Sequence, residues 1–334
     1  MAEKLPSGKY RTRATYTDEQ GKRRSVSFTR NSAKEADYAA LEFKLGKRRL
    51  SAASAISVGD ALDIYIESNA AVLSPSTING YNGYRRNNYH SIQDIPLRKL
   101  TPRMVQSWVN EQAATLSPKT VRNVYGLLAA ALKRECPDAL LGINLPQKIR
   151  REIIIPQRSE ISAILDAARG TSLYLPILLA AHCGMRRSEV CALTWKDVDL
   201  KKKTIAVNKA MVTDGIGWVV KQPKSSAGYR TLDMSNAVYD YLSNADKKQP
   251  LISINPDTFT NAFGKLCARL GMAYHPHALR HFYCSVLASS GIPMKYAQML
   301  MGHSSGDMIN KVYAHILKED EERYRSRALS ALEL

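Results

Sequence analysis

The sequence predicts a mainly α-helical, multi-domain chain with small antiparallel β sheets, and three observations support this fold class. The chain has 334 residues, which is enough for two or three domains of the usual size of about 100–200 residues. Most of it carries apolar residues at helical spacing, and the alternation of a half-buried strand occurs in two short regions, 9–30 and 202–234. Hydrophobic residues make up 45% of the sequence, so packed cores can form.

Residues 1–50 are expected to form a β hairpin followed by a helix. In the first strand, aromatic and small side chains alternate with Lys9, Arg11 and Arg13, which gives the strand one basic face. The segment DEQG at 18–21 supplies a turn, and the return strand spans 23–28. A capping box from Ser32 to Glu35 then begins a helix that runs to about residue 48.

This hairpin is a candidate DNA-binding surface. A sheet with one basic face can lie in the major groove of DNA, although a solvated sheet edge would show the same pattern. The candidate DNA-binding residues are Lys9, Arg11, Arg13, Arg23 and Arg24.

Residues 57–140 are expected to form an all-helical domain of about four helices, after a linker of small residues at 51–57 (SAASAIS). Ser57 and Asp60 cap a helix that runs to residue 68. SPST at 74–77 and SPKT at 117–120 each offer a serine N-cap and a proline at the first helical position. The segment contains no strong motif, so a packing domain and a DNA-binding domain are both consistent with it.

Residues 155–334 are expected to form a third domain, after a basic, proline-punctuated linker at 140–160. It is helical from about residue 159, apart from three short runs, KKTIAVNKA, GWVVKQPK and GYRTLDM. These runs predict one small antiparallel sheet at about 202–234. Helices resume at residue 235, and the last segment, 317–334, is an amphipathic helix.

The charge balance indicates a polyanionic partner. There are 48 Lys and Arg residues against 30 Asp and Glu, a net charge of +18, and each predicted domain has a surplus of basic residues. Neutralising phosphates releases condensed counterions, so such a surplus favours nucleic acid; self-repulsion that keeps a protein in solution is the other explanation. The five cysteines form no CxxC pair and no stretch could span a membrane, so a reduced, cytosolic protein is expected.

Four local patterns in the third predicted domain carry the candidate chemistry, and the first two are centred on cations. Arg186 and Glu189 are three residues apart in GMRRSE, where a new helix starts after a glycine turn and puts both on one face, with Arg186 in its first turn. The run QPKSSAGYRTL places Lys224 in the predicted β hairpin.

The other two patterns contain histidines and a tyrosine. His277 and Arg280 share a helical face in HALRH. His303 follows in MGHSS, and Tyr313 comes ten residues later in VYAH.

Each pattern has an ordinary explanation when it is taken alone. His277 and His281 have the spacing of half a metal site, but the glutamate of an HExxH motif is missing and no other Cys/His cluster has ligand spacing. Tyr313 is one of 17 tyrosines, and Tyr283 and Tyr296 lie nearby. A single arginine or lysine is usually a solvated surface residue.

Together and in this order, the four patterns resemble the tyrosine recombinase, or phage integrase, family. The family signature is Arg, Lys, His-x-x-Arg, His or Trp, then Tyr, and all six positions are filled here. The matching stretches between about 155 and 320 are GMRRSEVCALTWKDVDL, QPKSSAGYRTLDM, HPHALRHFYCSVLASSGI and LMGHSSGDMINKVYAHI. The resemblance implies a catalytic domain at 155–334, and, by architecture alone, a core-site DNA-binding domain at 57–140 and an arm-type domain at 1–50.

The chemistry of these residue types fits the resemblance. Arg186 and Arg280 are expected to hold a phosphodiester with rigid, permanently charged guanidinium forks. Tyr313 is the expected nucleophile, and since a free phenol has a pKa near 10, it needs a proton acceptor, for which His277 is the candidate. Lys224 is expected to protonate the departing 5′ hydroxyl.

Two further residues complete the expected site. His303 is expected to donate a hydrogen bond to the phosphate, and Glu189 to orient the site from behind. The product would be a 3′-phosphotyrosyl bond that retains the phosphoester energy, so no ATP, metal ion or other cofactor is expected. The absence of a GxxxxGK[ST] loop and of a carboxylate cluster agrees with this.

The resemblance also implies partners. They are double-stranded DNA attachment sites, three further copies of the chain in a tetramer acting through a Holliday junction, and accessory proteins, namely a directionality factor and a host DNA-bending protein. Such an integrase would belong to a phage or a conjugative transposon and be cytoplasmic and nucleoid-associated. The segment 317–334 would either dock on a neighbouring protomer or cap its own domain.

Two alternatives to a recombinase are a type IB topoisomerase-like DNA relaxase and a sequence-specific DNA-binding protein with a decayed catalytic site. The arm-like N-terminus favours a recombinase over the relaxase. The intact set of six residues favours it over the decayed protein.

Overall fold

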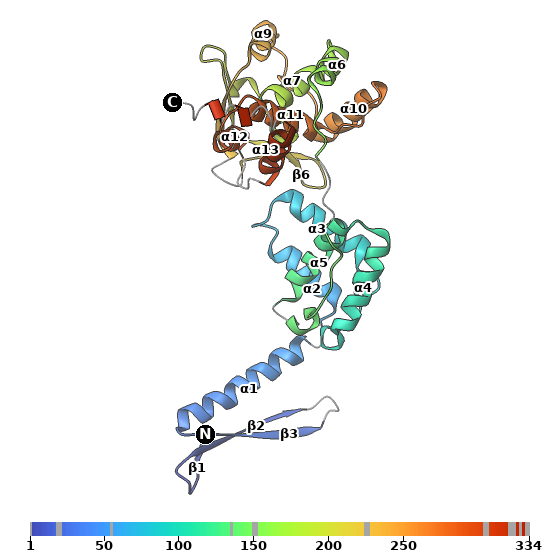
Figure 1. The fold of residues 1–334 in the computed structure, drawn as a ribbon. Coiled ribbons are helices and arrows are strands. Elements are labelled where there is room, and N and C mark those ends of the chain that lie inside the picture. Colours follow the sequence, from blue (N-terminus) through green and yellow to red (C-terminus); the bar gives the residue numbers. More distant parts are fainter. Residues whose placement is uncertain are drawn as a thin grey trace. The chain divides into compact units, whose positions relative to one another are not determined.

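A computed structural model divides the chain into two compact units, residues 1–149 and 150–334. It describes residues 2–17, 22–53, 56–133, 136–148, 153–223, 228–302, 307–319, 325–326 and 329–330. Within these residues the chain is mainly helical, and its strands form three small antiparallel sheets (Figure 1). The predicted fold class is therefore confirmed. None of the described helices is long and apolar enough to cross a membrane.

The first unit begins with a three-stranded antiparallel sheet that is covered on one face by a helix. Thr12 and Ala14 are buried beneath this helix, and the Thr12 hydroxyl donates a hydrogen bond of 2.6 Å to the Asp37 carboxylate. Phe43 of the helix contacts the ring of Phe28 at a centroid distance of 5.4 Å. The elements are β1 (Glu3–Lys4), β2 (Tyr10–Thr17), β3 (Arg23–Arg30) and α1 (Ala33–Ala53), and the strand order is β1-β2-β3.

The strand register decides which basic side chains share the open face of this sheet. Residues paired across an antiparallel ladder lie on the same face, and consecutive residues lie on opposite faces. Arg11 and Arg13 lie opposite the face that carries Thr12 and Ala14, and Arg23 alternates onto the same open face. The cross-strand neighbours of Arg11 and Arg13 on that face carry hydroxyls, namely Thr29 and Ser27, and a further pair of hydroxyl residues, Thr15 and Ser25, lies beside them.

Arg24 is the exception among the predicted DNA-binding residues. It pairs with Tyr16, so it lies on the face covered by α1. The five candidate residues therefore do not all share one face, because Arg23 and Arg24 are neighbours within one strand and must point to opposite faces. Lys9 directly precedes β2, and the predicted turn at 18–21 lies outside the described residues.

The helix α1 is longer than the sequence predicts. It continues to Ala53, into the segment expected to be a linker. Alanine is the best helix former, so the small residues at 51–53 extend a helix that is already nucleated. At its start, the backbone N–H of Glu35 donates to the Ser32 hydroxyl at 3.2 Å, as the predicted cap requires.

Four α-helices follow, as predicted, and three of them begin at the predicted residues Ser57, Ser74 and Ser117. The Ser57 hydroxyl accepts from the Asp60 backbone N–H at 3.1 Å, and the hydroxyl of Ser117 caps its helix in the same way. In their core, the rings of Tyr89 and Trp108 stack at 5.3 Å. The elements are α2 (Val58–Ser68), α3 (Pro75–Asn88), η1 (Leu97–Lys99), α4 (Pro102–Thr115), α5 (Pro118–Leu132) and η2 (Pro137–Leu140).

The second unit is organised around helix α11 (Pro276–Ser289), which contacts α7, α10, α12 and α13 (Figure 1). Phe259, Phe263 and Leu279 belong to a buried cluster between these helices. The other α-helices of the unit are α6 (Arg158–Ala168), α7 (Tyr174–His182), α8 (Arg187–Val190), α9 (Asn236–Asn244), α10 (Pro256–Arg269), α12 (Met294–Met301) and α13 (Asp307–Glu319).

The strands of this unit form two sheets, whereas the sequence predicts one. Within the run KKTIAVNKA one strand ends at Val207, and the next strand begins at Ala210, the last residue of the run, and pairs with a different partner. Lys209 is fixed at this break by an ion pair of 2.6 Å with the buried Asp197. The sheets are β4-β5-β8 and β6-β7, built from β4 (Val198–Asp199), β5 (Thr204–Val207), β6 (Ala210–Thr213), β7 (Trp218–Lys221) and β8 (Arg230–Asp233).

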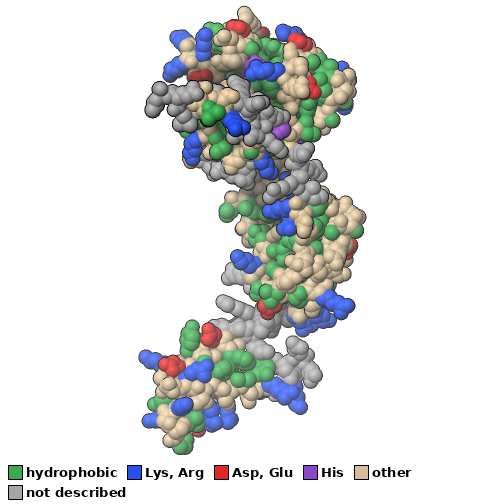
Figure 2. Space-filling view, in the orientation of Figure 1, with side chains coloured by type: hydrophobic (Ala, Val, Ile, Leu, Met, Phe, Trp, Pro, Cys, Tyr) green, Lys and Arg blue, Asp and Glu red, His purple; other side chains and the backbone are tan. Residues whose placement is uncertain are grey.

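Basic side chains are widely distributed over the surface. In Figure 2, Lys and Arg side chains are spread over the visible face of both units and are not confined to one end of the sequence. Both units therefore present basic side chains to an anionic partner on this face, which agrees with the charge balance.

Candidate active site

Arg186 lies where a buried helix turns at a glycine. The helix α7 ends at His182, and Gly184 adopts a left-handed conformation with φ +59°. A β carbon at this position would collide with the ring of Tyr283. Arg186 is the N-cap of α8, one position before the first helical turn in which the sequence placed it. Its backbone N–H donates to the Glu189 carboxylate at 2.9 Å.

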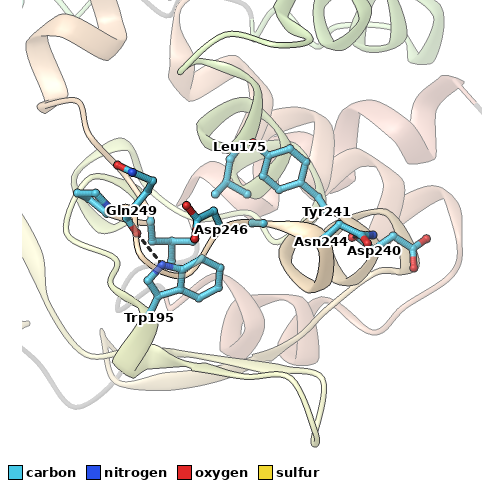
Figure 3. Close-up of a pocket in the computed structure, with 10 residues that line it drawn as sticks. Leu175, Trp195, Asp240, Tyr241, Asn244, Asp246 and Gln249 are labelled. Atoms are coloured by element: carbon cyan, nitrogen blue, oxygen red, sulfur yellow. Dashed lines mark hydrogen bonds between the residues drawn. The ribbon is translucent and has the colours of Figure 1, made fainter.

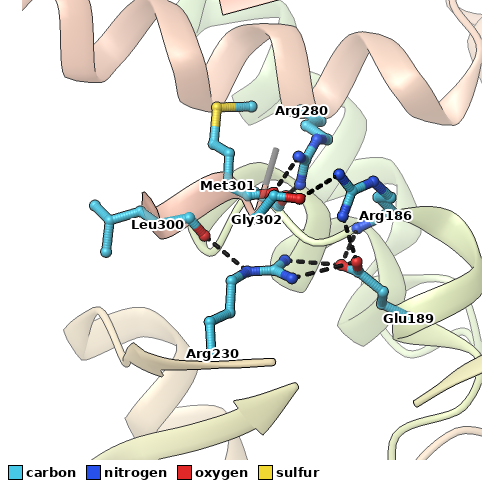
Figure 4. A network of polar contacts seen from close by, with 8 residues as sticks. Arg186, Glu189, Arg230, Arg280, Leu300, Met301 and Gly302 are labelled. Atoms are coloured by element: carbon cyan, nitrogen blue, oxygen red, sulfur yellow. Dashed lines mark hydrogen bonds and ion pairs between the residues drawn. The ribbon is translucent and has the colours of Figure 1, made fainter. Parts of the chain in front are cut away.

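Three arginines converge on the C-terminus of α12 (Figure 4). Each guanidinium donates a hydrogen bond to one of three consecutive backbone carbonyl groups. The pairs are Arg230 with Leu300 (2.7 Å), Arg280 with Met301, and Arg186 with Gly302 (2.7 Å). Because the last carbonyls of a helix lack partners within the helix and carry partial negative charge, cations bind well there. The end of α12 is thereby fixed to α8, β8 and α11.

One carboxylate, Glu189, joins two of these arginines. It accepts hydrogen bonds from Arg186 at 2.6 Å and from both terminal nitrogens of Arg230 at 2.7 and 3.2 Å. Burial raises the pKa of Glu189, but hydrogen bonds and charge from Arg230, together with the charge of Arg186, outweigh burial and lower the pKa to about 2. The carboxylate is therefore ionised at neutral pH.

The arginines differ in their exposure. The Arg280 side chain is fully buried, and it donates to the carbonyl oxygens of Gly184 and Met301. Burial, and secondly the charge of Arg186, lower the pKa of Arg280 to about 9, so the guanidinium stays protonated at neutral pH. Arg186 is 32% exposed and can meet a ligand directly.

His277 lies one turn before Arg280 on α11, as predicted. It is exposed to solvent, and the ring of His281 meets it edge-on at a centroid distance of 4.8 Å. Partial loss of hydration, followed by the charges of His281 and Arg280, lowers the pKa of His277 to about 4. The imidazole is thus neutral at neutral pH and can accept a proton. The described residues contain no group of three His, Cys, Asp or Glu side chains that could hold a metal ion.

The Tyr313 side chain lies on α13, half-buried beside Cys284, Met301 and Val312. Its hydroxyl donates a hydrogen bond of 2.8 Å to the carbonyl oxygen of Ile292, in the loop between α11 and α12. In this structure the phenol proton is therefore directed at a backbone carbonyl.

Two predicted site residues, Lys224 and His303, lie outside the described residues. In the chain, Lys224 falls between the end of β7 and the start of β8, and His303 directly follows Gly302, the left-handed C-cap of α12.

Arg230 is a member of the network that sequence reasoning missed. Its strand shows a signal that could have revealed it, because Arg230 and Leu232 alternate onto one face of β8 and Leu232 is buried. An arginine in such a position requires a charged or hydrogen-bonded partner. Its side chain is only 6% exposed.

A separate cleft in the second unit has the opposite electrostatic character (Figure 3). Asp240 and Asp246 line it beside Trp195, whose indole N–H donates to the Gln249 carbonyl at 2.9 Å. The described residues that line this cleft include no lysine or arginine, and they include none of the predicted site residues. A phosphate would be repelled there, so the candidate site for phosphate chemistry is the arginine network.

Comparison with known proteins identifies a family model and relatives that agree with the resemblance drawn from the motifs. Residues 157–320 match the model of the phage integrase family. A XerC-like tyrosine recombinase of Caldanaerobacter subterraneus is 24% identical, over 95% of each chain. The transposase of transposon Tn916 from Enterococcus faecalis is 27% identical over 42% of each chain.

Two solved structures share the fold. The Tn1549 transposon integrase in complex with transposon right end DNA has a TM-score of 0.69 and 21% identity, over 81% of this chain and 99% of that one. A lambda integrase tetramer bound to a Holliday junction has a TM-score of 0.60 and 16% identity, over 91% and 96% of the two chains.

Fold and relatives together define an enzyme of site-specific DNA recombination. The chain belongs to the tyrosine recombinase, or phage integrase, family. The resemblance drawn from the four motifs is thus confirmed, and neither the topoisomerase-like nor the inactive alternative gains support from these comparisons.

Proposed function

We propose that this chain cleaves and rejoins DNA strands through a 3′-phosphotyrosyl bond to Tyr313, without metal or ATP. The observation that carries this proposal is the convergence of Arg186, Arg230 and Arg280 on the C-terminus of α12, where two of them share the carboxylate of Glu189. Three guanidiniums and one carboxylate leave a surplus of positive charge in a partly desolvated site. Such a site favours the charge that develops on a phosphate during transfer.

In the proposed cleavage step, the phenol oxygen of Tyr313 attacks the phosphorus and its proton passes to neutral His277. The bond to the 5′ oxygen breaks, and Lys224 supplies the proton that this oxygen takes up. Arg186 contacts a nonbridging oxygen from the exposed side, Arg280 adds charge from the buried side, and His303 donates a further hydrogen bond. Rejoining is the same sequence in reverse, with a 5′ hydroxyl as the nucleophile.

Tyr313 must exchange its partner before this step. Its hydroxyl hydrogen-bonds the Ile292 carbonyl, so attack requires α13 to shift and release that bond. We place this shift after DNA binding, when the phosphate is already on the arginines. Residues 317–334 continue α13 in the sequence, and docking of that segment on a neighbouring protomer would couple the shift to assembly.

The proposed DNA contacts of the first unit begin at the open face of its sheet. Arg11, Arg13 and Arg23 lie there among threonine and serine hydroxyls, a composition suited to phosphate contacts in an arm-type site. The helices at 57–140 would bind the core site. Lambda integrase is described as a tetramer on a Holliday junction, and we propose the same assembly on two attachment sites here, with a directionality factor and a host bending protein as accessory partners.

A nicked suicide duplex tests the proposed function, because loss of the short strand beside the nick traps the covalent adduct. The duplex carries the attachment-site sequence read from the DNA that flanks the gene. Full-length protein in EDTA should form an SDS-stable adduct, and Tyr313→Phe should bind the same DNA without forming it. Tyr296→Phe is the matched control and should retain the adduct. An adduct that survives in Tyr313→Phe, or relaxation of supercoiled plasmids that lack attachment sites, would contradict the proposal.

A further inference from the structure

We infer that Arg230 is a positioning residue that holds Glu189 and thereby keeps Arg186 available for the phosphate. This inference rests on the proposed function, since it concerns the orientation of the arginine expected to meet the DNA.

The first support is the way Glu189 divides its two oxygens. Oε1 accepts from Arg186 at 2.6 Å and from Arg230 at 3.2 Å. Oε2 accepts from Arg230 at 2.7 Å and from the backbone N–H of Arg186 at 2.9 Å. Arg230 therefore grips both oxygens with a fork, whereas the Arg186 side chain holds one of them.

The second support is burial. Glu189 and Arg230 are 8% and 6% exposed, and Arg186 is 32% exposed. A buried carboxylate that loses its principal cation must find another partner or be neutralised. Without Arg230, the charged group that remains on Glu189 among the described residues is Arg186. The carboxylate would then take the Arg186 fork for itself and cancel the charge meant for the phosphate.

The third support is the position of Arg230 in the chain. It is the first residue of β8, directly after the segment that contains Lys224, and its Nε donates to the Leu300 carbonyl at 2.7 Å. Leu300 lies three residues before His303. One side chain thus ties the strand that follows one predicted catalytic residue to the helix end that precedes another.

The test is a double-mutant cycle with Arg230→Gln, Glu189→Gln and the double variant, in the full-length protein. Single-turnover cleavage of the nicked attachment-site duplex is measured with saturating enzyme. We expect Arg230→Gln to slow cleavage about 10- to 100-fold, the range typical for a group that orients an active-site ligand. DNA affinity should stay within about twofold, because the exposed contacts are unchanged.

The double variant separates positioning from a purely structural role. Removing the carboxylate charge frees Arg186 again, so the double variant should cleave about tenfold faster than Arg230→Gln alone, a non-additive result. A purely structural ion pair would also recover in the double variant, but in unfolding free energy, because the unpaired buried carboxylate is removed. The rates are therefore measured where denaturant titration shows every variant folded, and a double variant that is then as slow as Arg230→Gln would overturn the inference. Cleavage by Arg230→Gln at the wild-type rate would overturn it as well.

Two further variants serve as a control and as a replacement. Arg169→Gln removes an exposed arginine–carboxylate pair from the same unit and should cleave like wild type. Should Arg230→Gln fail to fold, Arg230→Lys takes its place: a cation stays beside Glu189, so cleavage should slow by less than about tenfold, and a loss of about 100-fold would overturn the inference. A wild-type protein that forms no adduct contradicts the proposed function itself, whereas a wild-type adduct without recovery contradicts only the role of Arg230.

Discussion

The arginine network of the second unit and the open sheet face of the first unit are both basic, but they hold their charge differently. In the network, each guanidinium is fixed by a backbone carbonyl, and two of them share one carboxylate. On the sheet, Arg13 and Arg23 are exposed, and Arg11 has a weak contact of 3.4 Å with the exposed Glu3. Fixed charge suits one phosphate in one geometry, and mobile charge suits a run of phosphates along a backbone.

Removing one fixed charge should have the largest effect. Arg186→Gln is expected to lower the single-turnover cleavage rate about 10²–10³-fold, which corresponds to about 2.7–4 kcal/mol of lost transition-state stabilisation. Arg187→Gln is the matched control, because Arg187 is the next residue in the chain but its guanidinium is exposed and donates a hydrogen bond to the Thr260 hydroxyl. Equal losses in both variants would mean that the fixed charge has no special role.

The backbone that fixes the network can be tested at Gly184. Gly184→Ala places a β carbon against the Tyr283 ring and also strains a left-handed residue, so unfolding free energy should fall by about 2–4 kcal/mol. Gly170→Ala has the same backbone strain at φ +71° with open space around it, and should lose about 1 kcal/mol. Denaturant titration of both variants measures the part of the loss that comes from the collision with Tyr283. Equal losses of unfolding free energy would show that this collision does not occur.

Because the pKa of His277 is lowered, the cleavage rate should change little as the pH falls below neutrality. A proton acceptor is active in its neutral form, and with a pKa near 4 that form persists as the pH falls from 8 to about 5. Cleavage at subsaturating DNA should therefore decline only below about pH 5. A decline centred near 6.5, the ordinary histidine value, would show that the site does not depress the pKa of this imidazole.

Removing the arginines on the open face of the sheet should have the smallest effect, and the effect on DNA affinity should be similar for each of them. Each of Arg11→Ala, Arg13→Ala and Arg23→Ala should lower the slope of log affinity against log salt by about 0.9, the value for one lost phosphate contact. Arg24→Ala should change the slope less, because the register places Arg24 on the helix side. A larger slope change for Arg24→Ala than for Arg13→Ala would show that the wrong face has been assigned to DNA.

The sequence was informative where chemistry depends on residue order and local spacing. The caps at Ser57 and Ser117, the hairpin at 9–30 and the pairing of Arg186 with Glu189 all follow from short-range rules. It was uninformative where long-range partners decide the structure. Nothing local tells that Arg230 meets Glu189, because the two residues lie 41 positions apart, or that Asn208 and Lys209 divide one run between two sheets.

The hydrogen bond between the Tyr313 hydroxyl and the Ile292 carbonyl has a consequence for cleavage at unrelated DNA sequences. If Tyr313 is the nucleophile, as proposed, its hydroxyl stays hydrogen-bonded to a peptide carbonyl while unrelated DNA presents phosphates to the arginines, and cleavage there is suppressed. Under this proposal, breaks at unrelated sequences would be rare without a separate inhibitor.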